Sequence, residues 1–188
     1  MKTMIFFALM CTSLSLISCD KIKEATSQDF KVKNVSFNFT AESNDVSTTS
    51  GGDVKTRAAT SQSFTVTRTV NMSEIGSNDV MEYANKIKKV SVDNSLIRVT
   101  VNPAGAYTVE NLTVTASGVS GSLVIPSYTI GNPFTLTSDM NAFTNTFIMK
   151  LLSAKSVSVT VTGMTDAPAG TTINISYESD LLFTASIL

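Results

Sequence analysis

Glu178 and Asp180 are the two acidic residues of this sequence whose spacing best suits acid–base chemistry. Residues two apart in a strand share a face, and paired carboxylates held about 5–10 Å apart can cleave a glycosidic bond. The segment Glu178-Ser179-Asp180 also fits a solvent-facing turn between two strands, and we favour that interpretation. We therefore assign no catalytic residue.

Histidine is absent from the 188 residues, and its absence excludes several chemistries. Ser-His and Cys-His nucleophile pairs are impossible, and the commonest metal ligand is missing. The sequence has no Gly-x-Ser-x-Gly motif, no calcium-loop spacing and no glycine-rich segment that opens a helix after a strand. We expect a non-enzymatic protein with no metal and no cofactor.

Tyr107, Tyr128 and Tyr177 are the candidates for exposed rings that stack on sugars. Tyrosine is also common in strands for packing reasons alone, and the chain has no tryptophan. Sugar binding is therefore an alternative function. Five phenylalanines lie in alternating strand patterns and are expected in the core: Phe30, Phe37, Phe39, Phe64 and Phe134.

The first eighteen residues are organised like a bacterial export signal. Lys2 supplies a positive charge, and the mostly apolar run over residues 4–17 is too short to span a bilayer as a helix. The run ends in Leu16-Ile17-Ser18-Cys19, which resembles the lipobox of bacterial lipoproteins. The resemblance implies cleavage before Cys19 and attachment of a diacylglycerol to its thiol. The alternative is an ordinary signal peptide with a chance cysteine near its end.

Lipidation of Cys19 would decide where the protein resides and which cysteine chemistry it retains. Cleavage removes Cys11, so no intramolecular disulfide can form and a zinc site would need carboxylates alone. Residues 19–29 are polar and suit a tether, although Lys21 and Lys23 are weak evidence for headgroup contacts. The resemblance implies the outer membrane of a Gram-negative envelope, on either the periplasmic or the surface face. The net charge of −1 gives no basic footprint for nucleic acid.

Arg57 lies in a long polar segment before an expected strand. Its placement loosely resembles that of fimbrillin-type lipoproteins, which are cleaved after an arginine and then accept the next subunit's strand by β-addition. The resemblance implies a mature N-terminus at Ala58, and this pilus-subunit function is the least favoured alternative.

From Phe30 onward, apolar residues recur with the two-residue period of strands. The register of this alternation changes between Val32 and Val35, which predicts a bulge. Residues 42–62 are almost free of apolar side chains and are expected to form a mobile loop. Pro126 must lie at a sheet edge or a bulge because it cannot donate to a strand ladder. Further strands are expected over residues 63–72, 90–92, 96–101, 107–116, 123–130, 134–137, 156–162, 173–177 and 181–188.

Two segments have helical periodicity instead. Asp79 is expected to cap a helix that continues to about Lys89, with Lys86, Lys88 and Lys89 complementing the helix dipole. Its buried stripe is expected to comprise Val80, Tyr83, Ala84 and Ile87. A second helix is expected from Asp139 to about Ala154, with an apolar side formed by Met140, Phe143, Phe147, Leu151 and Ala154.

Strands that recur about every ten residues predict a mainly β fold, an antiparallel β-sandwich of immunoglobulin-like architecture with one or two short helices in its crossovers. We expect a signal peptide over residues 1–18, a tether over 19–29 and a single domain over 30–188. The expected function is a lipid-anchored, non-enzymatic binding or structural module of the cell envelope, whose partner is a protein or a glycan.

Overall fold

The computed structural model describes residues 27–45 and 61–186. Cys19 and Arg57 therefore lie outside the described residues, as do most of the segment 42–62 and most of the tether. The described ends of the segment 42–62 are not the expected loop, because Asn44–Asp45 form β2 and Gln62 begins β3. Strand β1 begins at Ser27 rather than at Phe30. The elements are β1 (Ser27–Glu42), β2 (Asn44–Asp45), β3 (Gln62–Asn71), η1 (Met72–Ile75), α2 (Asn78–Tyr83), β4 (Ile87–Asn102), β5 (Thr108–Ala116), β6 (Leu123–Thr129), β7 (Phe134–Thr135), α3 (Ser138–Ala154), β8 (Ser156–Thr165) and β9 (Thr172–Ser186).

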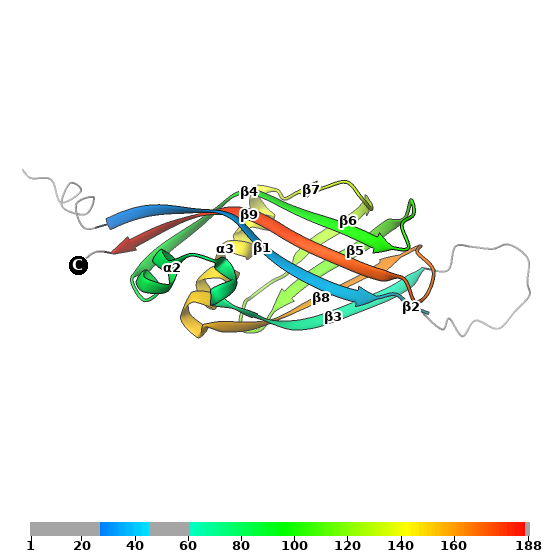
Figure 1. Cartoon of the computed structure of the whole chain (residues 1–188), viewed down its shortest axis with the longest axis horizontal. Helices are drawn as coiled ribbons and strands as arrows, with labels where there is room; N and C mark the ends of the chain where they lie inside the picture. The colour runs from blue at the N-terminus through cyan, green and yellow to red at the C-terminus, as the bar shows by residue number, and fades with distance from the viewer. Residues whose placement is uncertain (1–26, 46–60, 187–188) are drawn as a thin grey trace, which may run out of the picture.

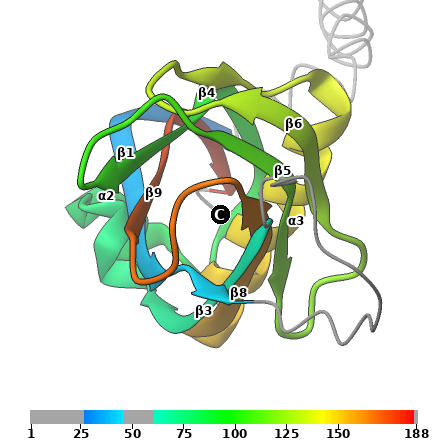
Figure 2. The same ribbon diagram turned by 90° about the vertical axis from the view of Figure 1, so that its right-hand side faces the viewer.

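The described strands form two antiparallel sheets that pack face to face, which confirms the expected β-sandwich (Figure 1). We call them the first sheet, in the order β1-β9-β4-β7, and the second sheet, in the order β2-β3-β8-β5-β6. The two sheets curl around one interior, and α3 lies along one side (Figure 2). The amide of Gly131 donates to the carbonyl of Val99 at 3.1 Å and links the end of β6 to β4. The amide of Ser43 donates to the carbonyl of Thr171 at 3.0 Å on the β1 side.

Strand β9 is the centre of the first sheet and pairs with β1 on one side and β4 on the other. The turn expected at residues 178–180 is wrong, because β9 continues unbroken through it. Tyr177, Ser179 and Leu181 are all buried, so the inward alternation is not interrupted. Glu178 and Asp180 are the outward residues between them. Polar residues on the solvent face of an antiparallel strand resemble, in the sequence, the polar residues of a turn.

Two bulges bend the strands on either side of β9. The predicted bulge between Val32 and Val35 is confirmed, and a second register shift lies between Asp93 and Leu96 of β4. Asn34 and Asn94 occupy these bulges with positive φ angles of 57° and 48°. Asparagine tolerates this left-handed conformation better than most residues. Pro126 lies in β6 at the edge of the second sheet, as expected.

The first helix is shorter than the sequence predicts. Helix α2 covers Asn78–Tyr83 and is capped by Ser77, not Asp79. Ile87 already pairs with Ala185 of β9, because burial in the sheet outweighs the helical periodicity of this segment. The last turn of α2 contains no basic residue, so the expected dipole role of Lys86, Lys88 and Lys89 is wrong. Lys88 lies instead within a register shift of β4.

The second helix agrees closely with the expected one. Helix α3 covers Ser138–Ala154, and the Thr137 hydroxyl accepts from the amide of Met140 at 3.4 Å. Its buried face contains Phe147 and Leu151 as expected, whereas Ala154 is exposed. No helix among the described residues combines the length and the apolar character needed to cross a bilayer.

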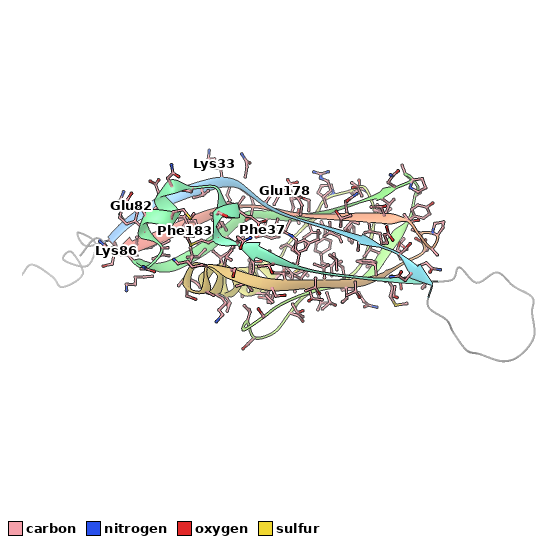
Figure 3. All side chains as sticks on the ribbon, turned by 60° about the horizontal axis from the view of Figure 1, so that its bottom comes forward. Lys33, Phe37, Glu82, Lys86, Glu178 and Phe183 are labelled. Atoms are coloured by element: carbon pink, nitrogen blue, oxygen red, sulfur yellow. The ribbon has the colours of Figure 1, made fainter. Side chains whose placement is uncertain are left out.

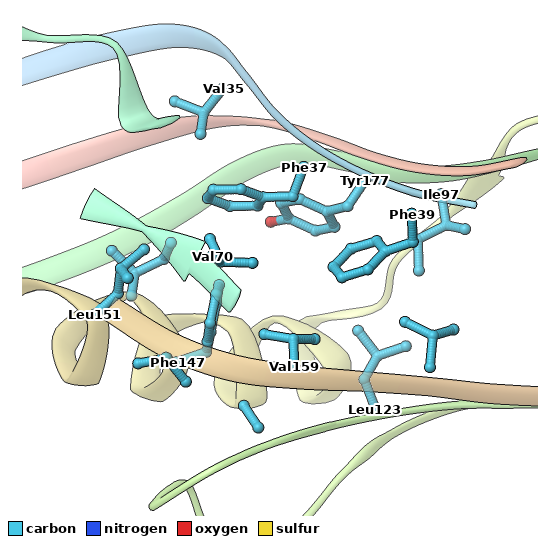
Figure 4. Packing of buried hydrophobic residues seen from close by; sticks show 14 of the residues in the cluster. Val35, Phe37, Phe39, Val70, Ile97, Leu123, Phe147, Leu151, Val159 and Tyr177 are labelled. Carbon is cyan, nitrogen blue, oxygen red and sulfur yellow. The ribbon is translucent and has the colours of Figure 1, made fainter. Parts of the chain in front are cut away.

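The interior between the sheets is apolar and aromatic (Figure 4). Phe37, Phe39 and Phe64 are buried, and Phe30 and Phe134 are partly buried against them, in agreement with the sequence. The ring of Phe37 stacks on Tyr177 at 6.0 Å between centroids and meets the edge of Phe147 at 5.7 Å. Each such side chain contributes about 1.5–3 kcal/mol by leaving water. This core holds β1, β9 and α3 together and so fixes the face that β9 turns outward.

Candidate functional site

A shallow groove crosses the outer face of the first sheet. The groove consists of two adjoining hollows, one of about 690 Å³ and one of about 290 Å³. Asn38 and Ser176 line both hollows. Figure 3 shows Glu178 on this outer face, while Phe37 and Phe183 lie inside the sandwich. The larger part is lined by Asn34, Ser36, Asn38, Asn94, Leu96, Ser176, Glu178, Ser179 and Asp180.

The strand register arranges the lining in rows across β1, β9 and β4. The successive rows are Ser36–Glu178–Leu96, Asn38–Ser176–Arg98 and Thr40–Asn174–Thr100. At about 3.3 Å per residue, the groove extends roughly 20 Å along β9 from Asn174 to Asp180. Apart from Leu96, every residue of these rows carries an amide, hydroxyl, carboxylate or guanidinium group, so the surface can both donate and accept hydrogen bonds.

Asp180 closes one end of the groove in an ionic cluster. The Lys31 ammonium lies 3.1 Å from a carboxylate oxygen of Asp180 and 3.1 Å from one of Asp93. The backbone amide of Asn34 donates to Asp180 Oδ1 at 3.1 Å. The hydrogen bond from Lys31, followed by that from the Asn34 amide, lowers the pKa of Asp180 below its usual range.

The carboxylates expected as a possible pair do share one face of β9, but they have different surroundings. Asp180 is held ionised by Lys31, and a carboxyl group with a lowered pKa is a poor general acid near neutral pH. Glu178 accepts a long hydrogen bond of 3.4 Å from the Ser176 hydroxyl. This arrangement favours ligand contacts over proton transfer.

Several polar groups of the groove have no partner among the described residues. The side chains of Asn38 and Arg98 form no hydrogen bond or ion pair within that part of the chain. Thr40 donates to the side chain of Asn174 at 2.9 Å, so two residues of the row Thr40–Asn174–Thr100 already hydrogen-bond to each other. The central row therefore carries the largest unused hydrogen-bonding capacity.

The three tyrosines do not form an exposed stacking platform, so that expectation is wrong. Tyr177 is only 9% exposed, and burial raises its pKa to about 12. Tyr128 packs against Phe134 at 5.9 Å between ring centroids, and burial raises the pKa of its hydroxyl as well. Tyr107 also packs against the core and is only partly exposed. Strand alternation turns Tyr177 inward, between Ile175 and Ser179.

A gap between the sheets, lined by described residues, is too small to be a comparable site. The gap measures about 40 Å³ and lies beside α3, and Phe37, Phe147 and Tyr177 are among its lining residues. Ligand pockets usually measure about 300–1,000 Å³, so this gap is a packing defect. Within residues 27–45 and 61–186, no group of three or more cysteines, histidines or acidic residues could hold a metal ion.

Sequence reasoning missed Asn34, Asn38, Asn94 and Arg98. The signal for the β1 residues was present, because the outward positions between its buried apolar residues are polar. The pairing of β1 and β4 with β9 joins residues more than a hundred positions apart in part of the groove, and no local pattern shows it. Lys21, Lys23, Cys19 and Arg57 lie outside the described residues, so lipidation and cleavage after Arg57 stay predictions.

No protein-family model matches this chain, and no curated protein sequence matches it.

Proposed function

We propose that this chain is a lipid-anchored protein of a Gram-negative cell envelope that binds a glycan, without catalysis, through the groove of the first sheet. The single observation that supports binding is the concentration of polar side chains from β1, β9 and β4 in one hollow of about 690 Å³. The lipobox-like segment Leu16-Ile17-Ser18-Cys19 supports the anchor. The proposal applies to either the periplasmic or the surface face of the outer membrane.

The chemistry of the lining favours a polyhydroxylated ligand. A sugar chain presents many hydroxyl groups, each of which can donate and accept a hydrogen bond. A surface that carries both donors and acceptors can therefore satisfy more of these groups than a surface with donors alone or acceptors alone. The groove combines donors at Arg98, acceptors at Glu178 and mixed groups at Asn38. An extended chain also matches a long, open hollow better than a compact ligand does.

The geometry of the chain is compatible with an anchored protein that presents this groove. Ser27, the first residue of β1, is paired with Ser186 at the same end of the sandwich. Cys19 precedes Ser27 by eight residues, which can span at most about 28 Å. Asn34 lies ~23 Å along β1 from Ser27, so the groove begins well beyond the point where the chain from Cys19 enters the sandwich.

The anchor is tested by mass spectrometry of the N-terminal peptide from the native host. We expect a mass for Cys19 that includes a diacylglycerol thioether, and its loss together with membrane association in Cys19→Ser. An unmodified Cys19 in the secreted protein would contradict the anchor but would leave the groove untouched.

Glycan binding is tested with the full chain purified in detergent. We expect retention on at least one immobilised polysaccharide and weaker retention for Asn38→Ala in the central row. Thr65→Ala is the matched control, because Thr65 is exposed on the second sheet and outside the groove. Equal retention of both variants, or no retention of the wild type, would contradict the proposal.

A further inference from the structure

The charged side chains of the groove fall into two groups. Lys31 bridges Asp180 and Asp93 at 3.1 Å each, so these three charges are held by one another at the end of the groove. Arg98 and Glu178 are the others, and neither belongs to an ion pair among the described residues. The groove therefore contains one unpaired positive charge and one unpaired negative charge.

The strand register places Arg98 and Glu178 in adjacent rows without setting them directly opposite each other. Glu178 lies opposite Leu96 of β4, and Arg98 lies opposite Ser176 of β9. The two charged residues thus occupy adjacent rows on a diagonal, where long side chains could meet, yet no salt bridge joins them. Asn38 extends the row of Arg98 across β9, about 10 Å away at the usual strand spacing.

This arrangement discriminates by the charge of the ligand. Near an ionised hydrogen-bond partner, a neutral hydroxyl forms a bond roughly twice as strong as one between neutral groups. A ligand with a high net charge gains attraction from one of the two residues but meets repulsion from the other. Asp180 and Asp93 with Lys31 add a net charge of −1 at the end of the groove, from two carboxylates and one ammonium. The groove therefore repels a polyanion and offers a polycation only a small net attraction.

We infer that the ligand of this groove is an uncharged glycan, whose hydroxyls accept from Arg98 and Asn38 and donate to Glu178. This inference rests on the proposed glycan-binding function and specifies its substrate class. Arg98 and Glu178 are specificity-determining residues, since they recognise hydroxyls while their opposite charges give a polyanion or a polycation no net attraction.

The test compares three classes of polysaccharide with the full chain in detergent. The probes are neutral glucans and mannans, the polyanions polygalacturonate and alginate, and the polycation chitosan. Affinity is measured at 50 mM and 500 mM salt for the wild type, Glu178→Gln and Arg98→Gln. The matched controls are Glu110→Gln and Lys33→Gln, which neutralise exposed charges outside the groove.

We expect a neutral polysaccharide to bind best, with less than a twofold change between the two salt concentrations. Each groove variant should weaken this binding by about three- to tenfold, since a charge-assisted hydrogen bond becomes a neutral one, and neither control should. Preferential, salt-sensitive binding of a polyanion or polycation would overturn this inference and leave the proposed function standing. Unchanged neutral binding in both groove variants would also overturn it, whereas absence of binding to every probe would overturn the proposed function itself. Thermal melting of each variant verifies that it is folded.

Discussion

Asn34 and Asn94 hold the same left-handed backbone conformation on opposite sides of one strand, at φ angles of 57° and 48°. Each lies in a bulge, one in β1 and one in β4, and β9 runs between them. Both residues line the groove beside Asp180. The two bulges thus shape the end of the candidate binding site. The same two residues that bend the strands also line the groove.

The first prediction concerns the backbone at Asn34. Replacement by alanine should lower the free energy of unfolding by about 1 kcal/mol, because alanine lacks the short polar side chain that makes the left-handed region accessible to asparagine. Asn34→Gly should be close to neutral, since glycine adopts positive φ readily. Urea unfolding measures both changes. Asn38→Ala, at an extended position of the same strand, is the control, and equal effects at positions 34 and 38 would contradict the role of the conformation.

The second prediction concerns the ion pair at Asp180. Its pKa is lowered in the folded protein by Lys31 and the Asn34 amide, whereas the unfolded value is near 3.9. A lowered pKa adds stability above the unfolded value, and this stability is lost as the pH falls through the folded pKa. The wild type should therefore exceed Asp180→Asn in melting temperature at pH 5–7, and the difference should shrink toward pH 2. Glu110→Gln controls for the loss of a surface carboxylate, and a difference independent of pH would contradict the assignment.

The third prediction concerns Arg68, which sits 4.8 Å above the ring of Phe39. Its guanidinium donates to both carboxylate oxygens of Glu74, at 3.2 and 2.8 Å, and Glu74 also accepts from the Asn71 amide at 2.8 Å. Partial burial raises the pKa of Glu74, but the bonds from Arg68 and Asn71 together outweigh it, so the net pKa is lowered. Glu74→Ala should cost about 1–3 kcal/mol of unfolding free energy.

A double-mutant cycle separates the two contributions of Arg68. We expect a coupling energy of about 1 kcal/mol between Arg68→Met and Glu74→Ala, because methionine retains the apolar contact with Phe39 but not the ion pair. Additive effects of the two substitutions in chemical denaturation would contradict the pairing.

The fourth prediction concerns α3 as part of the core. Leu151 is fully buried, and Leu151→Ala should destabilise the protein by about 2–5 kcal/mol through lost burial and the resulting cavity. Ser153→Ala, an exposed change in the same helix, should shift the denaturation midpoint little. A similar small shift for Leu151→Ala would show that α3 docks loosely.

Local patterns in the sequence were sufficient for much of the fold. Val35, Phe37, Phe39 and Ala41 alternate with polar residues, and all four are buried as this period predicts. Helix α3 was predictable because its apolar residues recur at helical spacing over several turns. These elements are determined mainly by which face is buried, and the spacing of apolar residues along the sequence indicates that face.

Long-range pairing explains what the sequence did not show. Ile87 fits the apolar stripe of a helix, but its pairing with Ala185 makes it a strand residue. Glu178 and Asp180 fit a turn, but the strands on both sides of them keep β9 extended. The groove needs β1, β9 and β4 to be neighbours, although β1 and β9 lie at opposite ends of the chain.

Chemical-shift mapping by NMR tests the central claim most directly, because it locates a bound glycan without altering the protein. The full chain in detergent micelles is titrated with the neutral oligosaccharide of highest affinity. We predict that the largest shifts fall on Asn38, Ser176 and Arg98, with small shifts at Thr65 and Thr160 of the second sheet. Saturable shifts concentrated on the second sheet, with none in the groove, would contradict the account.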